Sequence, residues 1–251
     1  MFKNGFWLIA AALSGLMPSG HAAEFTINPL QISLDRTSRA SEISVRNDAN
    51  ATLRMQVQAM SWRQDAAGQD QYEPAEGLLY FPRVMEISAG DTRIIRVGVK
   101  ATPTTREETY RVFVEELPPA NQANAGPPGG ASLQVLLRVG VPVFVVPLQP
   151  ERKAEITELT LRGATAAWVL ANTGNVHLRA EKVALAGVAR DGSTLFEQVF
   201  QERYFLAGVV KTLRFDIPLE KCVQLAALEA SVQAENLELK RKLDVAPGSC
   251  R

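Results

Sequence analysis

The sequence offers few residues that could carry out chemistry. Beyond the first 22 residues it contains one histidine, His177. Two acidic pairs, Glu107 with Glu108 and Glu115 with Glu116, are adjacent in sequence, so on a strand their members point to opposite faces and cannot act together as acid and base. There is no Gly-x-Ser-x-Gly, P-loop or dinucleotide-binding motif. The sequence therefore predicts a protein that is not an enzyme, with no catalytic residues and no cofactor.

Two cysteines, Cys222 and Cys250, lie in the last third of the chain. In an oxidising compartment they could form a disulfide that closes a loop of about 30 residues and adds on the order of 3 kcal/mol of stability. The alternative is that Cys250, next to the last residue, is free. A metal site is not expected, because His177 is the one further ligand of the zinc-binding type.

The first 22 residues have the features of a signal peptide. Lys3 provides a positive charge, residues 6–13 form an apolar segment, and small residues at 20–23 offer a cleavage site after Ala22. No later segment approaches the roughly 20 continuous apolar residues of a membrane span. The 27 basic and 27 acidic residues balance, which argues against a nucleic-acid partner. We therefore expect an exported protein that does not insert into a membrane.

Short segments of alternating apolar and polar residues dominate the rest of the chain. They are separated by turn-forming sequences and predict an all-β protein, with seven or so strands before residue 147. Pro147 and Pro150 indicate a stiff hinge, so we expect an N-terminal domain at 23–147 and a C-terminal β-sandwich at 148–251. Residues 221–234 could form a short helix or a loop that leads into a strand.

Residues 118–147 carry the strongest functional signal. A Pro/Gly-rich loop at 118–132 leads into an apolar run at 133–146, which predicts a strand of about 14 residues. Its alternate positions place one apolar row on a single face: Leu133, Val135, Leu137, Val139, Val141, Val143 and Val145. An unprotected apolar edge strand is suited to pairing with another chain. The run could also be a central core strand, although Pro142 fits that position poorly.

Three segments occur in a specific order and spacing: ISVRND at 43–48, ISAGDTRIIRV at 87–97 and YRVFVEELPP at 110–119. Together they resemble the PapD-like periplasmic chaperones of chaperone–usher pilus systems. VPVFV at 141–145 and LANTGN at 170–175 resemble the archaic, spore-coat-U-associated branch in particular. The resemblance covers nearly the whole chain beyond the leader.

The resemblance implies two immunoglobulin-like sandwiches in an L-shaped arrangement. It also implies a periplasmic chaperone that binds pilus subunits by donor-strand complementation and delivers them to an outer-membrane usher. The residues expected to enter the subunit are Leu133, Val135 and Leu137, with Val139 and Val141 in a shifted register. Each fully buried side chain contributes roughly 1.5–3 kcal/mol.

Three family positions are occupied differently here. Gln31 and Pro142 stand where relatives carry the Arg and Lys that bind the carboxyl terminus of the subunit. Because a carboxylate requires a fixed donor, we expect Arg96 or Arg138 to replace them. Glu116 matches an acid that bridges the two domains, but Val146 stands at the position of its Arg partner.

A different class of function is a structural pilus or adhesin protein with two immunoglobulin-like domains. Such a protein would carry a self-complementing N-terminal extension, whereas here a strand is expected to begin almost directly after the leader, at Phe25. The sequence therefore favours the chaperone.

Overall fold

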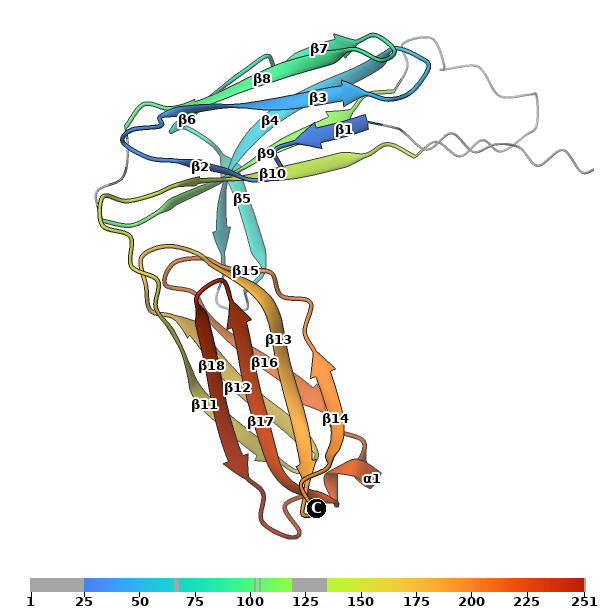
Figure 1. Cartoon of the computed structure of the whole chain (residues 1–251), viewed down its shortest axis with the longest axis vertical. Helices are drawn as coiled ribbons and strands as arrows, with labels where there is room; N and C mark the ends of the chain where they lie inside the picture. The colour runs from blue at the N-terminus through green and yellow to red at the C-terminus, as the bar shows by residue number, and fades with distance from the viewer. Residues whose placement is uncertain (1–24, 66–67, 102, 104, 119–134, 251) are drawn as a thin grey trace, which may run out of the picture.

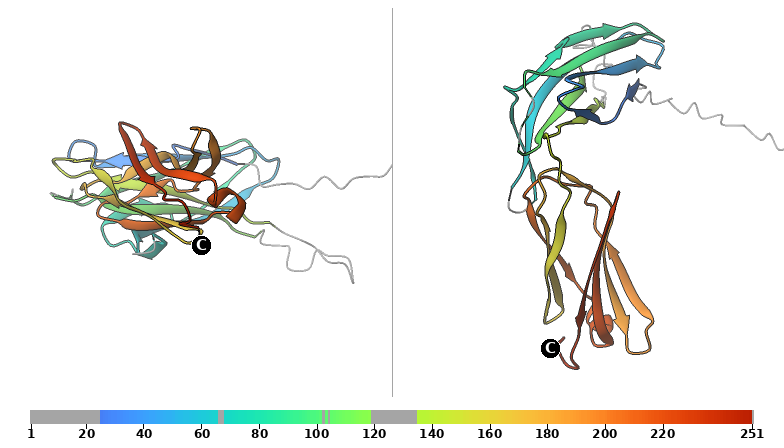
Figure 2. Two further views of the ribbon diagram at one scale, coloured as in Figure 1. Left: turned by 90° about the horizontal axis from the view of Figure 1, so that it is seen from below. Right: turned by 60° about the vertical axis from the view of Figure 1, so that its left-hand side comes forward.

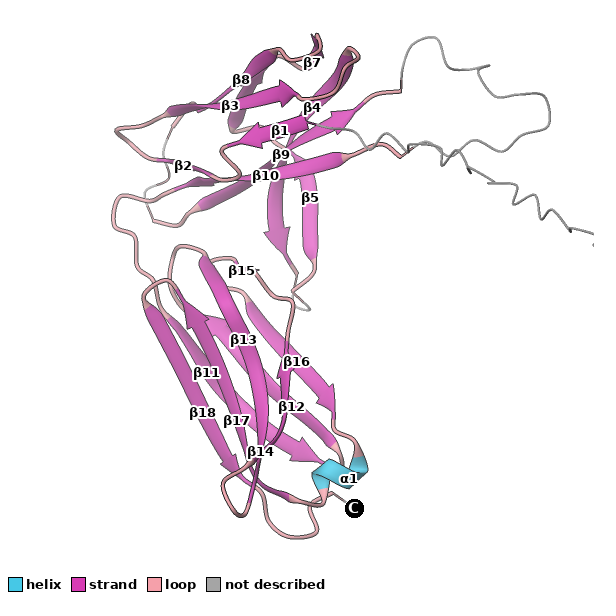
Figure 3. Ribbon diagram, turned by 45° about the vertical axis from the view of Figure 1, so that its right-hand side comes forward, coloured by secondary structure: helices cyan, strands magenta, loops and turns pink. Residues whose placement is uncertain are grey.

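The computed structural model describes residues 25–65, 68–101, 103, 105–118 and 135–250. The predicted leader, residues 119–134 and with them Leu133 lie outside this part of the chain. The described residues form two β-sandwiches whose long axes meet at a large angle, so that the molecule has the shape of an L (Figures 1 and 2). The predicted all-β fold is confirmed; the one helix in the described residues spans four residues (Figure 3).

The N-terminal sandwich consists of two sheets packed face to face. In order, the first sheet contains β1 (Phe25–Asn28), β3 (Ala40–Asn47), β8 (Thr92–Val99) and β6 (Leu78–Phe81). The second sheet contains β2 (Ile32–Leu34), β10 (Arg138–Val145), β9 (Glu108–Glu116), β4 (Leu53–Gln64) and β5 (Asp70–Pro74), and β7 (Val84–Ile87) pairs with β4.

Alternation along these strands explains why they pack in this way. On β9 the side chains of Tyr110, Val112 and Val114 enter the core, while Arg111 and Phe113 point to the outer face of the sheet. All the inner rows together form one hydrophobic core between the two sheets. The outer face of the second sheet is thus free to carry the contacts described below.

The C-terminal sandwich is also built from two sheets around its own core. One contains β11 (Ala154–Arg162), β12 (Thr165–Asn172) and β16 (Val210–Asp216). The other contains β14 (Thr194–Val199), β13 (Leu178–Ala189), β17 (Leu225–Ala234) and β18 (Leu237–Asp244), and β15 (Tyr204–Phe205) pairs with β13.

The structure differs from two expectations about local structure. The N-terminal sandwich has ten strands in the described residues, rather than about seven, because short segments pair separately: β1 and β2 belong to different sheets, and β5, β6 and β7 are distinct strands. For residues 221–234, a short helix and a loop leading into a strand were both expected as alternatives. This segment contains the end of α1 (Leu219–Cys222) and then β17, so most of it is strand.

Cys222 and Cys250 form a disulfide that closes a loop with a sequence separation of 28 residues. Cys222 is the last residue of α1 and is buried in the C-terminal core, as is Cys250. The bond therefore holds the end of the chain against the base of this domain. A cross-link that closes a loop of this length stabilises the fold chiefly by restricting the unfolded chain.

We predict that the double variant C222A/C250A lowers the free energy of unfolding of the C-terminal domain by about 3 kcal/mol. Urea titration of the oxidised proteins measures the difference. A reductant should shift the wild-type transition toward that of the variant and leave the variant unchanged. Equal midpoints for the oxidised wild type and the variant would contradict this account.

Candidate functional site

Strand β10 has two halves with different surroundings. Along its whole length it pairs with β9 in antiparallel register. On its other side β2 pairs in parallel with Val143–Val145 alone, from Ile32 to Leu34. In the described part of the chain no strand pairs with that side of residues 138–142. The two interpretations of the sequence, edge and central strand, thus each describe one half of β10.

The direction of the backbone groups on β10 follows from its pairing. The amide of Glu116 donates to the carbonyl of Leu137, so odd-numbered residues direct their N–H and C=O groups toward β9. Even-numbered residues direct theirs to the other side, as shown by Val146, whose amide donates to Leu34 on the β2 side. Arg138 and Gly140 therefore present N–H and C=O groups along the open edge.

Pro142 lies on the open half of β10, where its missing N–H has a clear consequence. Because it is even-numbered, the absent donor would have pointed away from β9, so the β9–β10 ladder is complete without it. The proline contributes only a carbonyl to the open edge. Its position explains why a proline is tolerated in a strand whose other half is central.

The strand is shorter than the predicted 14 residues, because β10 spans Arg138–Val145. Residues before Leu137 have no partner on β9, because β9 ends at Glu116. The amide of the next residue, Leu117, donates to the carbonyl of Arg54 instead. Val135 and Leu137 are therefore described but belong to no strand. Their side chains are 64% and 38% exposed, and the neighbouring Leu136 is exposed as well.

The remaining predicted donor residues lie deeper in the domain. Val139 is partly buried against the core, and Val141 is fully buried in it, with 0% exposure. Val141 already fills a place between the two sheets of its own domain. It is therefore not presented to another chain in this conformation, which differs from the expectation for that residue. Among the residues of the predicted row that the structure describes, Val135 and Leu137 are exposed.

The two candidate anchor cations, Arg96 and Arg138, are not brought together. Arg96 on β8 points away from the core, is exposed, and pairs with Glu42 at 3.2 Å. Arg138 pairs with Glu115 at 3.5 Å, and its guanidinium lies 4.0 Å from the ring centroid of Phe113. The two arginines thus occupy the outer faces of opposite sheets and cannot bind one carboxylate jointly.

Gln31 and Pro142, the two neutral positions, lie next to each other. The parallel register pairs Ile32 with Val143, so one step back along both strands places Gln31 beside Pro142. The side chain of Gln31 accepts a hydrogen bond of 3.2 Å from the hydroxyl of Tyr204 in the C-terminal domain. This position therefore contributes to the contact between the domains.

The acid that joins the two domains is Glu107, not Glu116. The buried carboxylate of Glu107 accepts hydrogen bonds from the backbone N–H of His177, at 2.7 Å, and from its ring Nδ1, at 2.9 Å. The His177 ring in turn stacks on Phe144 at 3.6 Å. Glu116 lies at the other end of β9, nine residues and about 30 Å away along the strand direction. With Val146 in place of the Arg partner, Glu116 does not bridge the domains here, and Glu107 makes the interdomain contact instead.

A second contact between the domains is made by the hairpin of β4 and β5. Gln64, the last residue of β4, donates to the carbonyl of Tyr204 and accepts from the amide of Leu206, both at 3.0 Å. Trp62 is buried with Phe144, Leu206 and Val209 in a small apolar cluster between the sandwiches. The guanidinium of Arg111 covers the Trp62 ring at 4.0 Å.

These interdomain contacts could hardly be predicted from the sequence. Asn175, seen there only as part of a turn, accepts from the amide of Glu151 and donates to the carbonyls of Thr105 and Gln149, which ties the hinge to both domains. Burial raises the pKa of Tyr72 on β5 to about 12, so its hydroxyl stays protonated and donates to Asp70. In the sequence, the available signals of the interdomain contacts were the lone histidine, His177, and the tryptophan near the end of β4, Trp62.

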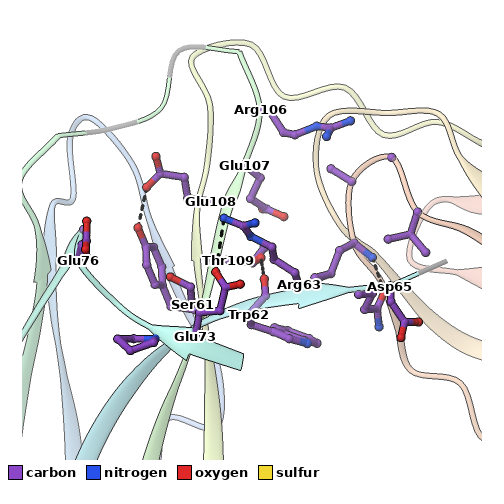
Figure 4. Close-up of a pocket in the computed structure, with 18 of the residues that line it drawn as sticks. Ser61, Trp62, Arg63, Asp65, Glu73, Glu76, Arg106, Glu107, Glu108 and Thr109 are labelled. Carbon is purple, nitrogen blue, oxygen red and sulfur yellow. Dashed lines mark hydrogen bonds and ion pairs between the residues drawn. The ribbon is translucent and has the colours of Figure 1, made fainter. Parts of the chain in front are cut away.

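A cleft of about 1130 Å³ lies where the N-terminal sandwich faces the loop 206–210. Figure 4 shows Arg106, Glu107 and Glu108 beside this cleft, with Trp62 and Thr109 at its floor. Acidic and basic side chains both line it, and none of its lining residues belongs to β10. The described residues contain no group of three or more potential metal ligands. They also contain no helix long and apolar enough to cross a membrane.

Residues 24–151, half of the chain, match the family model described as pili and flagellar-assembly chaperone, PapD N-terminal domain. The chain therefore belongs to this family of chaperones. None of the curated proteins matches it in sequence.

Solved structures of similar fold include a chain of the CsuC–CsuE chaperone–tip adhesion subunit complex from archaic Csu pili of Acinetobacter baumannii (16% identity, 86% of this chain and 98% of that one, TM-score 0.60). The Salmonella enterica complex of SafA pilin with SafB chaperone is similar at 14% identity, 89% and 98% coverage and TM-score 0.58. The Pseudomonas aeruginosa chaperone CupB2 is similar at 15% identity, 87% and 98% coverage and TM-score 0.53. At these identities the likeness shows the shared two-sandwich fold.

We predict that Glu107→Ala loosens the junction of the two domains. It leaves the buried N–H of His177 without its acceptor, which costs about 1–3 kcal/mol. Small-angle scattering should show a wider distribution of interdomain distances than for the wild type. Glu155→Ala, at an exposed position on β11, is the matched control. Identical scattering of E107A and wild type would show that this pair does not hold the domains.

Proposed function

We propose that this protein is a periplasmic chaperone that binds pilus subunits on the open edge of β10 and delivers them to an outer-membrane usher. The observation that supports this most directly is the half-paired strand. Arg138 and Gly140 direct unpaired backbone groups outward, next to exposed apolar side chains at residues 135–137. A subunit whose sandwich lacks one strand needs a partner that supplies unpaired backbone N–H and C=O groups and apolar side chains.

The donor segment proposed here is residues 133–139, with Leu133, Val135 and Leu137 as the residues that enter the subunit. Val139, which is partly buried, is at the limit of this segment. Arg138 is the cation on this edge. Its guanidinium is half-exposed on the outer face, where it could meet a carboxylate of the subunit once it leaves Glu115.

Periplasmic location is proposed from the predicted leader at 1–22 and from the disulfide between Cys222 and Cys250, because such bonds persist in oxidising compartments. Delivery to an usher is proposed from membership of the family. A structural pilus or adhesin role is less well supported. The chain matches a chaperone family model, and β1 begins at Phe25, directly after the predicted leader.

Charged residues in the donor segment should abolish capture of a subunit. We predict that V135D/L137D loses at least 100-fold in affinity for a co-expressed pilin, because two apolar side chains no longer contribute roughly 1.5–3 kcal/mol each. Co-purification and titration measure the loss. Val199→Asp, at an exposed apolar position of the C-terminal domain, is the control. Capture at wild-type level by V135D/L137D would exclude this segment as the donor.

Amide hydrogen exchange should separate the two sides of β10. In the free protein we expect slow exchange at Val139 and Val141, which bond to β9, and faster exchange at Arg138 and Gly140. When a pilin is bound, the amides of Arg138 and Gly140 should become slow while the others change little. Unchanged exchange at Arg138 and Gly140 in a stable complex would mean that the subunit binds elsewhere.

A further inference from the structure

The chain makes a corner directly beside the open edge of β10. Strand β2 pairs with β10 from Ile32 onward, whereas β1, which ends at Asn28, pairs with β3 in the other sheet. The three intervening residues, 29–31, cross from one sheet to the other. Because of this crossing, residues 138–142 have no strand partner on that side, and Arg138 and Gly140 are accessible there while Pro142 is buried.

Leu30 is at this corner and has no evident role in the fold. Its side chain is 67% exposed. Ile32 and Leu34, two and four residues later, are buried in the core. Gln31, the residue between Leu30 and Ile32, is held by Tyr204. A large apolar side chain is therefore displayed at the end of an unpaired strand edge.

Pro142 limits how far another strand can pair along this edge. Gly140 is the last residue with both an outward N–H and an outward C=O, because Pro142 has no N–H and β2 covers the strand from Val143. A strand bound to β10 must end or turn away at Pro142. Gln31 lies beside Pro142 in the parallel register, so Leu30 is one residue from this point.

The corner is uncharged on both sides. Residues 29–34 and 139–145 contain no ionisable side chain. Arg111, which lies opposite Pro142 in the register, covers Trp62 and pairs with Asp70 at 3.5 Å. A charged side chain placed at the corner would lose water without gaining a partner. An apolar side chain would instead bury Leu30.

We infer that Leu30 and Pro142 form an apolar stop that sets the register of a bound pilus subunit and contacts an apolar side chain at the end of its pairing strand. This rests on the proposed function. Leu30 is thus a specificity residue on the first segment of the chain, separate from the donor residues that precede β10. The occupant of the corner is a hydrophobic residue of the subunit.

Affinity for a co-expressed pilin tests this inference. We expect Leu30→Asp to weaken binding about tenfold, since loss of one apolar contact of this size changes affinity by this order. Leu30→Met should bind within twofold of wild type. Leu219→Asp, the same change at a 60% exposed position of the C-terminal domain, is the matched control and should have no effect. Both leucines are exposed, so the aspartates should not unfold the domains.

A photo-crosslinking residue at position 30 gives a second readout. It should label the end of the subunit's pairing strand, whereas the same residue at position 219 should not. If L30D binds as wild type while V135D/L137D does not, the apolar stop is overturned and the chaperone function stands. If neither variant weakens binding, the assignment of subunit binding to the open edge of β10 is wrong. A crosslink to the middle of the subunit strand would also overturn the stop.

Discussion

The structure depends on one constraint: the first segment of the chain pairs with two different sheets. Its early part, β1, extends the sheet of β3, and its later part, β2, extends the sheet of β10. Because a chain cannot be in both sheets at once, β10 is covered over three residues and left open over the rest. The N–H and C=O groups of Arg138 and Gly140 face outward as a direct consequence. An edge of this kind normally promotes aggregation, and here it is short and ends at a proline.

The two sandwiches are joined by buried polar contacts and by a small apolar cluster. Glu107 binds both the backbone and the ring of His177, and the Gln64 side chain bonds to the backbone beside β15. Phe144 connects these contacts to the donor strand, since it lies on β10 and stacks on His177. The half of β10 that β2 covers is thus also the half that faces the C-terminal domain. The open half extends away from the junction, where a large partner has room.

The outer face of β10 is shaped by its neighbour β9. A Cβ on Gly140 would lie 2.7 Å from Cδ of Arg111 and 3.0 Å from Cε1 of Phe113, so any larger residue there would force these side chains to shift. Arg138 covers Phe113, and Arg111 covers Trp62. These stacked side chains hold one face of the strand, and the core holds the other up to Val139. The strand edge is therefore kept straight although it has no partner on its open side.

Much of this architecture follows from local sequence. Alternation in segments such as 43–48 and 110–116 predicts strands, because side chains on a strand alternate between core and outside. Pro142 marks an interrupted edge, since a proline cannot donate to a ladder. The disposition of Arg96 and Arg138 could not be predicted in this way. Both are basic residues on strands, and only the pairing of the strands shows that they lie on opposite faces.

By itself, the sequence determined the all-β class, the apolar row at 133–145 and the family. The tertiary structure decided which part of that row is exposed, because Val141 is buried between the two sheets, whereas Leu137 lies where β9 ends and is exposed. It also decided that Glu107, rather than Glu116, joins the domains. These two glutamates lie at opposite ends of β9, one just before it and one as its last residue, and local sequence does not distinguish them. They differ in which end of the strand meets the second sandwich.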